Sequence, residues 1–224
     1  MSAEPESRRP LKSRDTGWAR AWAAGLARRG VSPDTVSAAS VACAIWGLAA
    51  FLCAGRLEGI GRVVALLAAA LAIQLRLVCN LLDGMVAVEH GRGGPAGPIW
   101  NELPDRVADV LLLVGAGYGA RMAGVGWAPV AGWIAAVLAV LTAYVRELGR
   151  GLGQPADFSG PGAKPHRMAV LTLVAVAAAI SEPHWRAAGT VIAMGLVVIA
   201  VLAGVTVIRR TLHLAARLAA PSVE

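Results

Sequence analysis

Long apolar runs alternate with short polar segments along most of this chain. Three runs carry no charged residue, at 36–54, 127–145 and 187–208. Each is close to the roughly 20 residues that a helix needs to cross the hydrocarbon core of a bilayer. Three weaker runs contain or adjoin polar residues, at 61–88, 103–120 and 167–180. The pattern predicts an all-α integral membrane protein with six transmembrane helices.

The segments outside these runs predict a simple organisation. Residues 16–30 favour an amphipathic helix at the membrane interface, with Trp18 and Trp22 on one face. Residues 1–15 read as a disordered basic tail, 31–212 as the single six-helix domain, and 213–224 as a C-terminal tail. Ser32 or Asp34 can cap the first transmembrane helix.

Composition and charge support this interpretation and set an orientation. The 224 residues are 57% hydrophobic, the mean hydropathy is +0.62 and the net charge is +7. With six spans, 16 of the 21 Lys and Arg residues fall on the side of both termini and 4 on the other. The positive-inside rule then places both termini in the cytoplasm, which for a bacterial chain means a multi-pass protein of the inner membrane. Anionic lipids are the expected electrostatic partner, and nothing indicates nucleic acid.

Acid and amide side chains recur at helical spacing within two of the weaker runs. Asn80 and Asp83 are three residues apart, and Asn101, Asp105 and Asp109 follow one another at intervals of four. Each set therefore lines one face of a helix. Ionisable groups at membrane depth are costly and mark a site by default. Two such helices facing each other would form a carboxylate cage for hard divalent cations.

The spacing of these residues resembles the signature of the CDP-alcohol phosphotransferases, D-x2-D-G-x2-A-R-x8-G-x3-D-x3-D. Here Asp83-Gly84-x2-Ala87 is followed, without a gap, by Gly97-x3-Asn101-x3-Asp105. The resemblance implies a six-helix membrane enzyme of phospholipid biosynthesis, often a homodimer. Such an enzyme moves a phosphatidyl group from a CDP-alcohol, in most cases CDP-diacylglycerol, to an alcohol acceptor and releases CMP. It implies Mg²⁺ or Mn²⁺ as cofactor, with two ions bridging the diphosphate.

Three positions depart from the signature. Asn80 and Asn101 replace aspartates, and Val88 replaces the arginine, as in a bacterial branch of the family. Amide oxygens can still ligate a metal but supply no charge. Two registers remain open: the ungapped one uses Asn101 and Asp105 as the last two acidic positions, and a gapped one uses Asp105 and Asp109. We prefer the ungapped register.

The resemblance also implies residue roles. Asp105 is the expected catalytic base, with Asp109 as the second candidate. The small residues beside Asp83 let a nucleotide approach the helix backbone. The expected metal ligands are Asn80, Asp83, Asn101, Asp105 and Asp109, and the expected nucleotide-binding residues are Asp83, Gly84, Ala87 and Gly97. Lys164, Arg167 and Arg146 are expected to bind an acceptor phosphate, although these residues also suit ordinary positive-inside charge.

Arg76 lies inside a predicted span and needs a partner, because a buried unpaired charge is strongly destabilising. The facing helix runs antiparallel, so Asp109 lies at a similar depth, one turn beyond Asp105. We therefore predict an Arg76–Asp109 structural pair, an inference from the residues and independent of the resemblance.

Two alternatives remain. The loss of two aspartates and one arginine also suits a catalytically degenerate relative that binds nucleotide or lipid without turnover. A cation transporter could place acids along an ion pathway, but the spacing of Gly84 and Ala87 has no role there.

Overall fold

A computed structural model describes residues 15–89 and 97–219, and this part of the chain contains α-helices and no strand. The all-α prediction is therefore confirmed for the described residues. Seven helices follow one another: α1 (Gly17–Arg28), α2 (Pro33–Arg56), α3 (Gly59–Glu89), α4 (Gly97–Met122), α5 (Ala128–Gly151), α6 (Lys164–Trp185) and α7 (Ala188–Ala219).

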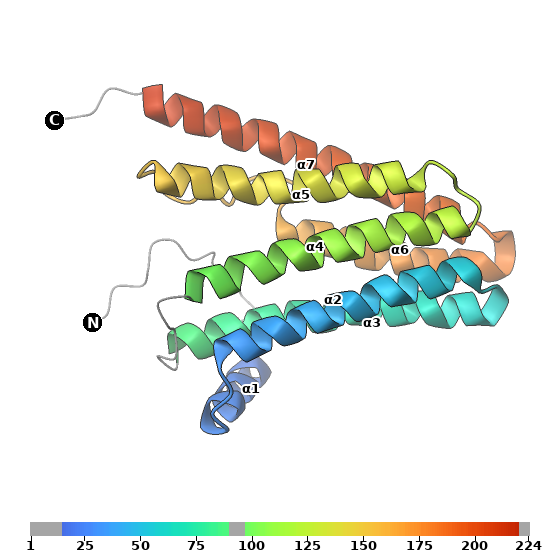
Figure 1. Ribbon diagram of the computed structural model, residues 1–224, viewed down its shortest axis with the longest axis horizontal. Coiled ribbons are helices and arrows are strands. Elements are labelled where there is room, and N and C mark those ends of the chain that lie inside the picture. Colours follow the sequence, from blue (N-terminus) through green and yellow to red (C-terminus); the bar gives the residue numbers. More distant parts are fainter. Residues whose placement is uncertain (1–14, 90–96, 220–224) are drawn as a thin grey trace.

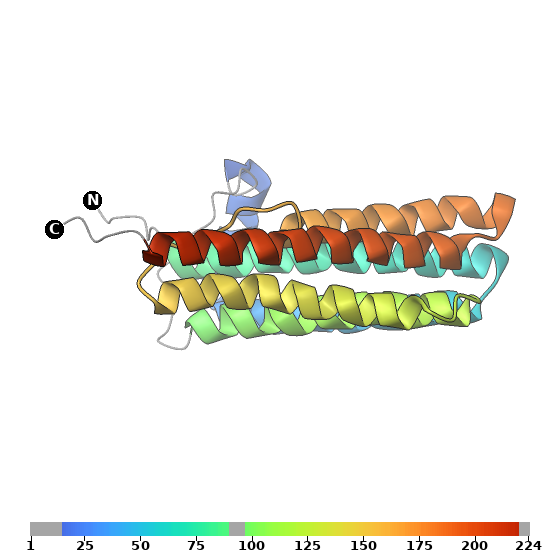
Figure 2. The ribbon, with the colours of Figure 1, turned by 90° about the horizontal axis from the view of Figure 1, so that it is seen from above.

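Helices α2 to α7 run side by side along the long axis of the molecule, and α1 lies outside this bundle (Figures 1 and 2). Neighbouring contacts close the six into a ring in the order α2, α3, α6, α7, α5, α4 and back to α2. Helix α1 packs against α3. The start of α2, the end of α3, the start of α4 and the ends of α5 and α7 all gather at one end of the bundle (Figure 1).

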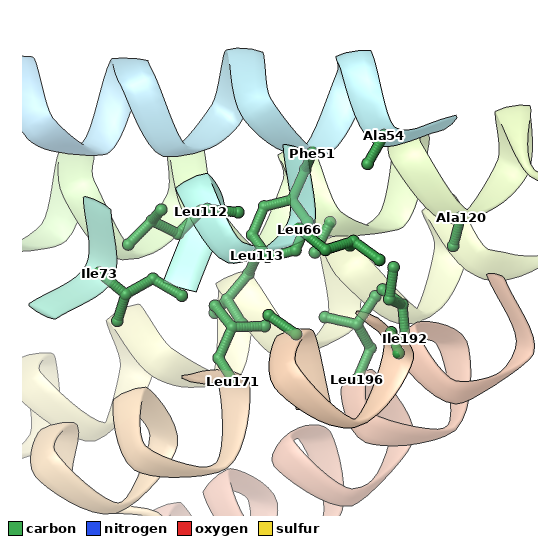
Figure 3. Packing of buried hydrophobic residues seen from close by; sticks show 14 of the residues in the cluster. Phe51, Ala54, Leu66, Ile73, Leu112, Leu113, Ala120, Leu171, Ile192 and Leu196 are labelled. Carbon is green, nitrogen blue, oxygen red and sulfur yellow. The ribbon is translucent and has the colours of Figure 1, made fainter. Parts of the chain in front are cut away.

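Small residues allow the helices to approach closely along their whole length. Many buried core residues are alanines, and leucine, isoleucine and phenylalanine fill the wider gaps between them (Figure 3). A Cβ on Gly119 would lie 2.3 Å from the carbonyl oxygen of Phe51, so α4 touches the backbone of α2 there. This is the close helix contact that small residues make possible in membrane bundles.

Local sequence sets where α2 and α4 begin. Ser32 caps α2, because its Oγ accepts a hydrogen bond from the Thr35 backbone N–H at 3.1 Å, and Pro33 follows at the first helical position. Helix α4 begins at Gly97, before the apolar run at 103–120, so Pro104 lies inside the helix. The polar residues of the motif thus belong to one continuous helix with the apolar run that follows them.

Among the residues that the structure describes, four helices are long and apolar enough to cross a membrane, by length and composition: Pro33–Arg56, Gly59–Val88, Ala128–Gly151 and Ala188–Ala219. Their outward faces are apolar; on α5, for example, Val130, Ile134, Val137 and Leu141 are exposed at helical spacing. Helices α4 and α6 lie within the same ring but carry more polar residues. The count of six spans remains a prediction.

Two further predictions concern the ends of the chain. A helix is present at α1, with Ala19 and Ala23 buried and Trp18 and Trp22 exposed; its place at a membrane interface remains a prediction. Residues 213–219, which we assigned to the C-terminal tail, continue α7 as a helix. The predicted disordered tail falls almost entirely outside the described residues.

Candidate active site

The polar residues singled out in the sequence meet at the end of the bundle where α3, α4, α5 and α6 face one another. A cavity of about 760 Å³ opens there. From the predicted set, its lining includes Asn80, Asp83, Gly84, Ala87, Gly97, Asn101, Asp105, Arg146, Lys164 and Arg167. Arg76 and Asp109 are not among the lining residues. Most of the residues that the sequence predicted for the site therefore line one cavity.

Two carboxylates face this cavity. Asp83 on α3 is 4% exposed and Asp105 on α4 is 6% exposed. Ser37 on α2 donates a 2.7 Å hydrogen bond to Asp83 Oδ2, which leaves Asp83 Oδ1 without a side-chain partner. An acid with an unpartnered oxygen at a cavity wall is positioned to bind a cation or a proton donor.

Asp105 is held by cations on several sides. Its Oδ1 accepts a 3.3 Å hydrogen bond from Arg76 Nη2, and its Oδ2 lies 3.6 Å from Arg106 Nη2. Lys164 Nζ contacts both Asp105 Oδ2 and Asn80 Oδ1. These contacts fix the carboxylate against the cavity wall.

Asp109 lies deeper, between two guanidinium groups. Arg76 Nη2 donates to its Oδ1 at 2.8 Å, so the Arg76–Asp109 pair expected from the sequence is present. Arg167 Nη2 donates to its Oδ2 at 2.7 Å. Asp109 and Arg76 are both 0% exposed. With both oxygens occupied and no exposed surface, Asp109 has no open path to a ligand in the cavity.

Arg167 is also committed to the protein. Its Nη1 donates to Thr142 Oγ1 at 3.0 Å and to the Gly162 carbonyl oxygen at 2.5 Å, and the residue is 2% exposed. Through these contacts Arg167 holds Asp109 and the loop before α6. Its expected part in binding an acceptor phosphate remains a prediction.

Lys164 and Arg146 approach the cavity from α6 and α5. Burial and the nearby Arg76 guanidinium lower the pKa of Lys164 to about 8, while Asp105 and Asp109 oppose that shift. Arg146 Nη2 pairs with Glu102 at 2.5 Å, and its guanidinium carbon lies 5.4 Å from the centre of the Phe158 ring.

The metal site expected from five side chains, two of them asparagines, remains a prediction. Within 15–89 and 97–219, no three His, Cys, Asp or Glu side chains are arranged to hold a metal ion. The reason is that both oxygens of Asp109 face guanidinium groups, which leaves Asp83 and Asp105. Together with the amide oxygens of Asn80 and Asn101, these are oxygen donors of the kind that Mg²⁺ and Mn²⁺ prefer. The chemistry of this donor set fits a divalent ion.

Several lining residues were not singled out in the sequence. Ser37 holds Asp83 but lies 46 residues away on another helix. Arg210, 5% exposed near the end of α7, donates to the carbonyl oxygens of Thr142 and Ser159 at 2.5 and 2.9 Å. An arginine at the end of a predicted span reads as positive-inside charge, so the sequence alone offered no sign of this role.

Comparisons with known proteins agree with this architecture. No family model matches the chain. It is 36% identical over 149 residues to the bifunctional IPC transferase and DIPP synthase of Rubrobacter xylanophilus, covering 64% of this chain. The chain spans 30% of the length of that relative.

Solved structures of the phosphatidylinositol phosphate synthase of Mycobacterium tuberculosis share the fold. The form with CDP-DAG bound aligns with a TM-score of 0.69 and 21% identity, over 88% of this chain and 92% of that one. The form with manganese and citrate aligns with a TM-score of 0.72 and 22% identity, over 92% of each chain. The chain therefore shares the fold of this synthase and is similar in sequence to the Rubrobacter transferase. Both comparisons agree with the resemblance inferred from the motif.

Proposed function

We propose that the chain is a membrane phosphotransferase of phospholipid biosynthesis. It would move a phosphatidyl group from CDP-diacylglycerol to an alcohol and release CMP. The observation that carries the proposal is the pair of buried acids, Asp83 and Asp105, facing one cavity at the basic end of the bundle. Support comes from the transferase name of the Rubrobacter relative and from the neighbour of the same fold with CDP-DAG bound.

In this proposal each motif residue has a stated task. The cytidine and its diphosphate lie along α3 and the start of α4, where Gly84, Ala87 and Gly97 leave room beside the backbone. Asp105 accepts the proton of the incoming hydroxyl, because it lines the cavity on α4 and is fixed there by its neighbours. Positioning and electrostatics supply most of the remaining catalysis in phosphoryl transfer.

Asn80, Asp83, Asn101 and Asp105 are the residues that would hold Mg²⁺ or Mn²⁺. Such an ion supplies positive charge to the diphosphate and to the departing CMP. The neighbour crystallised with manganese supports this choice of metal. Asp109 keeps a positioning role: through Arg76 it holds the carboxylate of Asp105. This assignment agrees with the ungapped register of the motif.

The acceptor side of the cavity is basic and aromatic. Arg146, stacked near Phe158, is the group that we assign to an acceptor phosphate. Arginine binds phosphate in a bidentate manner, and the salt bridge to Glu102 keeps its side chain directed along the cavity. A phosphorylated polyol is therefore the acceptor class that the cavity suits best.

The test is formation of a new phospholipid. Purified protein in detergent is supplied with CDP-diacylglycerol, Mn²⁺ and a pool of acceptors that includes glycerol phosphate, inositol phosphate and serine, and lipids are read by mass spectrometry. A new phosphatidyl product, absent with Asp105→Asn, is the expected result, and its mass names the acceptor. No product from any acceptor, with CDP-diacylglycerol still bound, would favour the degenerate binding protein suggested by Asn80 and Asn101.

A further inference from the structure

The side-chain ammonium of Lys164 lies at a position where the motif leads one to expect a metal. Lys164 is the first residue of α6, and its Nζ contacts Asn80 Oδ1 on α3 and Asp105 Oδ2 on α4. Both partners belong to the set of residues expected to ligate metal. The lysine side chain is 19% exposed and lines the cavity. A positive charge belonging to the chain itself thus lies between two candidate metal ligands from two helices.

The charges around the cavity leave little room for two divalent ions. The asparagines at 80 and 101 remove two negative charges relative to the family signature, and Asp109 is already paired with two arginines. Asp83 and Asp105 are the remaining motif carboxylates. Two divalent ions would bring four positive charges to these two acids, next to Lys164 and Arg76. Like charges at such separations repel strongly in a partly buried site.

We propose that Lys164 is a built-in second cation, which neutralises the donor diphosphate together with one divalent ion in place of a second ion. The diphosphate as ligand rests on the proposed function; the number of ions does not. An ammonium suits this place because it is a compact point charge with three donors, able to contact two protein oxygens and one phosphate oxygen. The site lacks two acidic ligands of the signature, and Lys164 brings a positive charge to the same place. Together these two features are one change in the charge of the site.

The first test counts ions. Mn²⁺ is titrated into the full chain in detergent and free Mn²⁺ is followed by electron paramagnetic resonance. The expected result for the natural chain is one ion per chain. The double variant Asn80→Asp/Lys164→Ala restores one carboxylate and removes the ammonium, so it should bind two. Two ions in the natural chain, or one ion in a double variant that melts at the same temperature, would overturn the proposal.

The second test measures affinity for CDP at saturating Mn²⁺. Lys164→Met should weaken CDP binding by about ten- to a hundredfold, the range expected when a charge-assisted hydrogen bond is lost. Arg150→Met is the matched control, because Arg150 lies at the rim of the same cavity, half exposed and paired with Glu147. Its effect should stay below about threefold, as for other exposed ion pairs. Equal effects of the two substitutions would contradict a specific role for Lys164.

Neither test requires turnover. A chain that makes no phospholipid but binds one Mn²⁺, and binds CDP through Lys164, would refute the proposed function and leave this inference standing. A chain that makes phospholipid but binds two Mn²⁺ would refute this inference alone.

Discussion

At the scale of single residues, positive and negative side chains from three helices alternate at the centre of this site. Arg76, Asp109 and Arg167 come from α3, α4 and α6, and their side chains are almost completely buried. A buried charge is tolerated only when its partners are in place. The three side chains therefore fix how these helices meet just below Asp105, and with it the shape of the cavity floor.

Breaking this network should cost stability. In Arg76→Met, Asp109 keeps Arg167 but loses its other guanidinium, and Asp105 loses one of its partners. Removing one member of a buried ion pair costs about 3–5 kcal/mol, so thermal unfolding in detergent should shift to a clearly lower temperature. The same substitution at Arg20, whose pair with Asp15 is exposed, serves as control and should have almost no effect. Equal melting temperatures for the two variants would count against the network.

The sequence was informative about these residues to different degrees. Arg76 and Asp109 could be paired in advance, because a charge inside an apolar run demands a partner and helical spacing limits the choice. The partner of Arg167 could not be predicted, since a basic residue at the start of a span also suits a phosphate or the positive-inside rule. Its hydrogen bond to Asp109 joins α6 to α4 and depends on how the whole bundle packs.

At the scale of elements, α2 and α4 form one of the closest contacts in the bundle. Gly119 of α4 lies against the backbone of Phe51, and a Cβ on Gly55 of α2 would lie 2.4 Å from the carbonyl oxygen of Gly119. Leu112 of α4, labelled in Figure 3, continues this contact, since a Cβ on Gly47 of α2 would lie 2.5 Å from its Cδ2. Because α4 carries Asp105, the distance between α2 and α4 also sets where that carboxylate lies relative to Asp83.

A methyl group at this contact should therefore be poorly tolerated. Gly119→Ala should lower the free energy of unfolding by about 1–3 kcal/mol, the usual cost of overpacking a close contact. Gly126→Ala is the control, because a Cβ there meets nothing within 4 Å. Chemical denaturation in mixed micelles measures both. Unchanged stability of Gly119→Ala would show that the helices can separate at no cost.

The helix that Gly119 would meet could not be predicted from the sequence, because it depends on how the whole bundle packs. The helix expected to carry Asn101, Asp105 and Asp109 is present as α4, and Asn101 and Asp105 line the cavity.

At the scale of the whole molecule, the ring of six helices brings several helix ends together at one end of the bundle (Figure 1). These are the start of α2, the end of α3, the start of α4 and the ends of α5 and α7. The site lies at that end. The fold class could be predicted from the apolar runs, because the length and composition of each run decide how its helix is solvated. The circular order of the helices could not be predicted, because it depends on which small-residue faces match, and a single sequence does not show this.

Orientation gives a prediction at this scale. A green fluorescent protein fused after Glu224 should fluoresce, since the basic end is expected in the cytoplasm. Alkaline phosphatase inserted at Gly124, between α4 and α5, should be active, because that turn lies at the opposite end of the bundle. Reporters that give the reverse pattern would show that the charge bias does not set the topology.

The central claim is that Asp83 and Asp105 form the reacting end of a CDP-alcohol site. The most direct measurement is CMP release from CDP-diacylglycerol, with Mn²⁺ and pooled acceptors, by the natural chain and by Asp83→Asn and Asp105→Asn. Loss of a catalytic base costs about 10²- to 10⁴-fold. The account predicts acceptor-dependent CMP release that falls at least a hundredfold in Asp105→Asn and severely in Asp83→Asn, measured at a temperature where thermal melting shows that both variants are still folded. CMP release that persists at more than half the natural rate in either variant would contradict it.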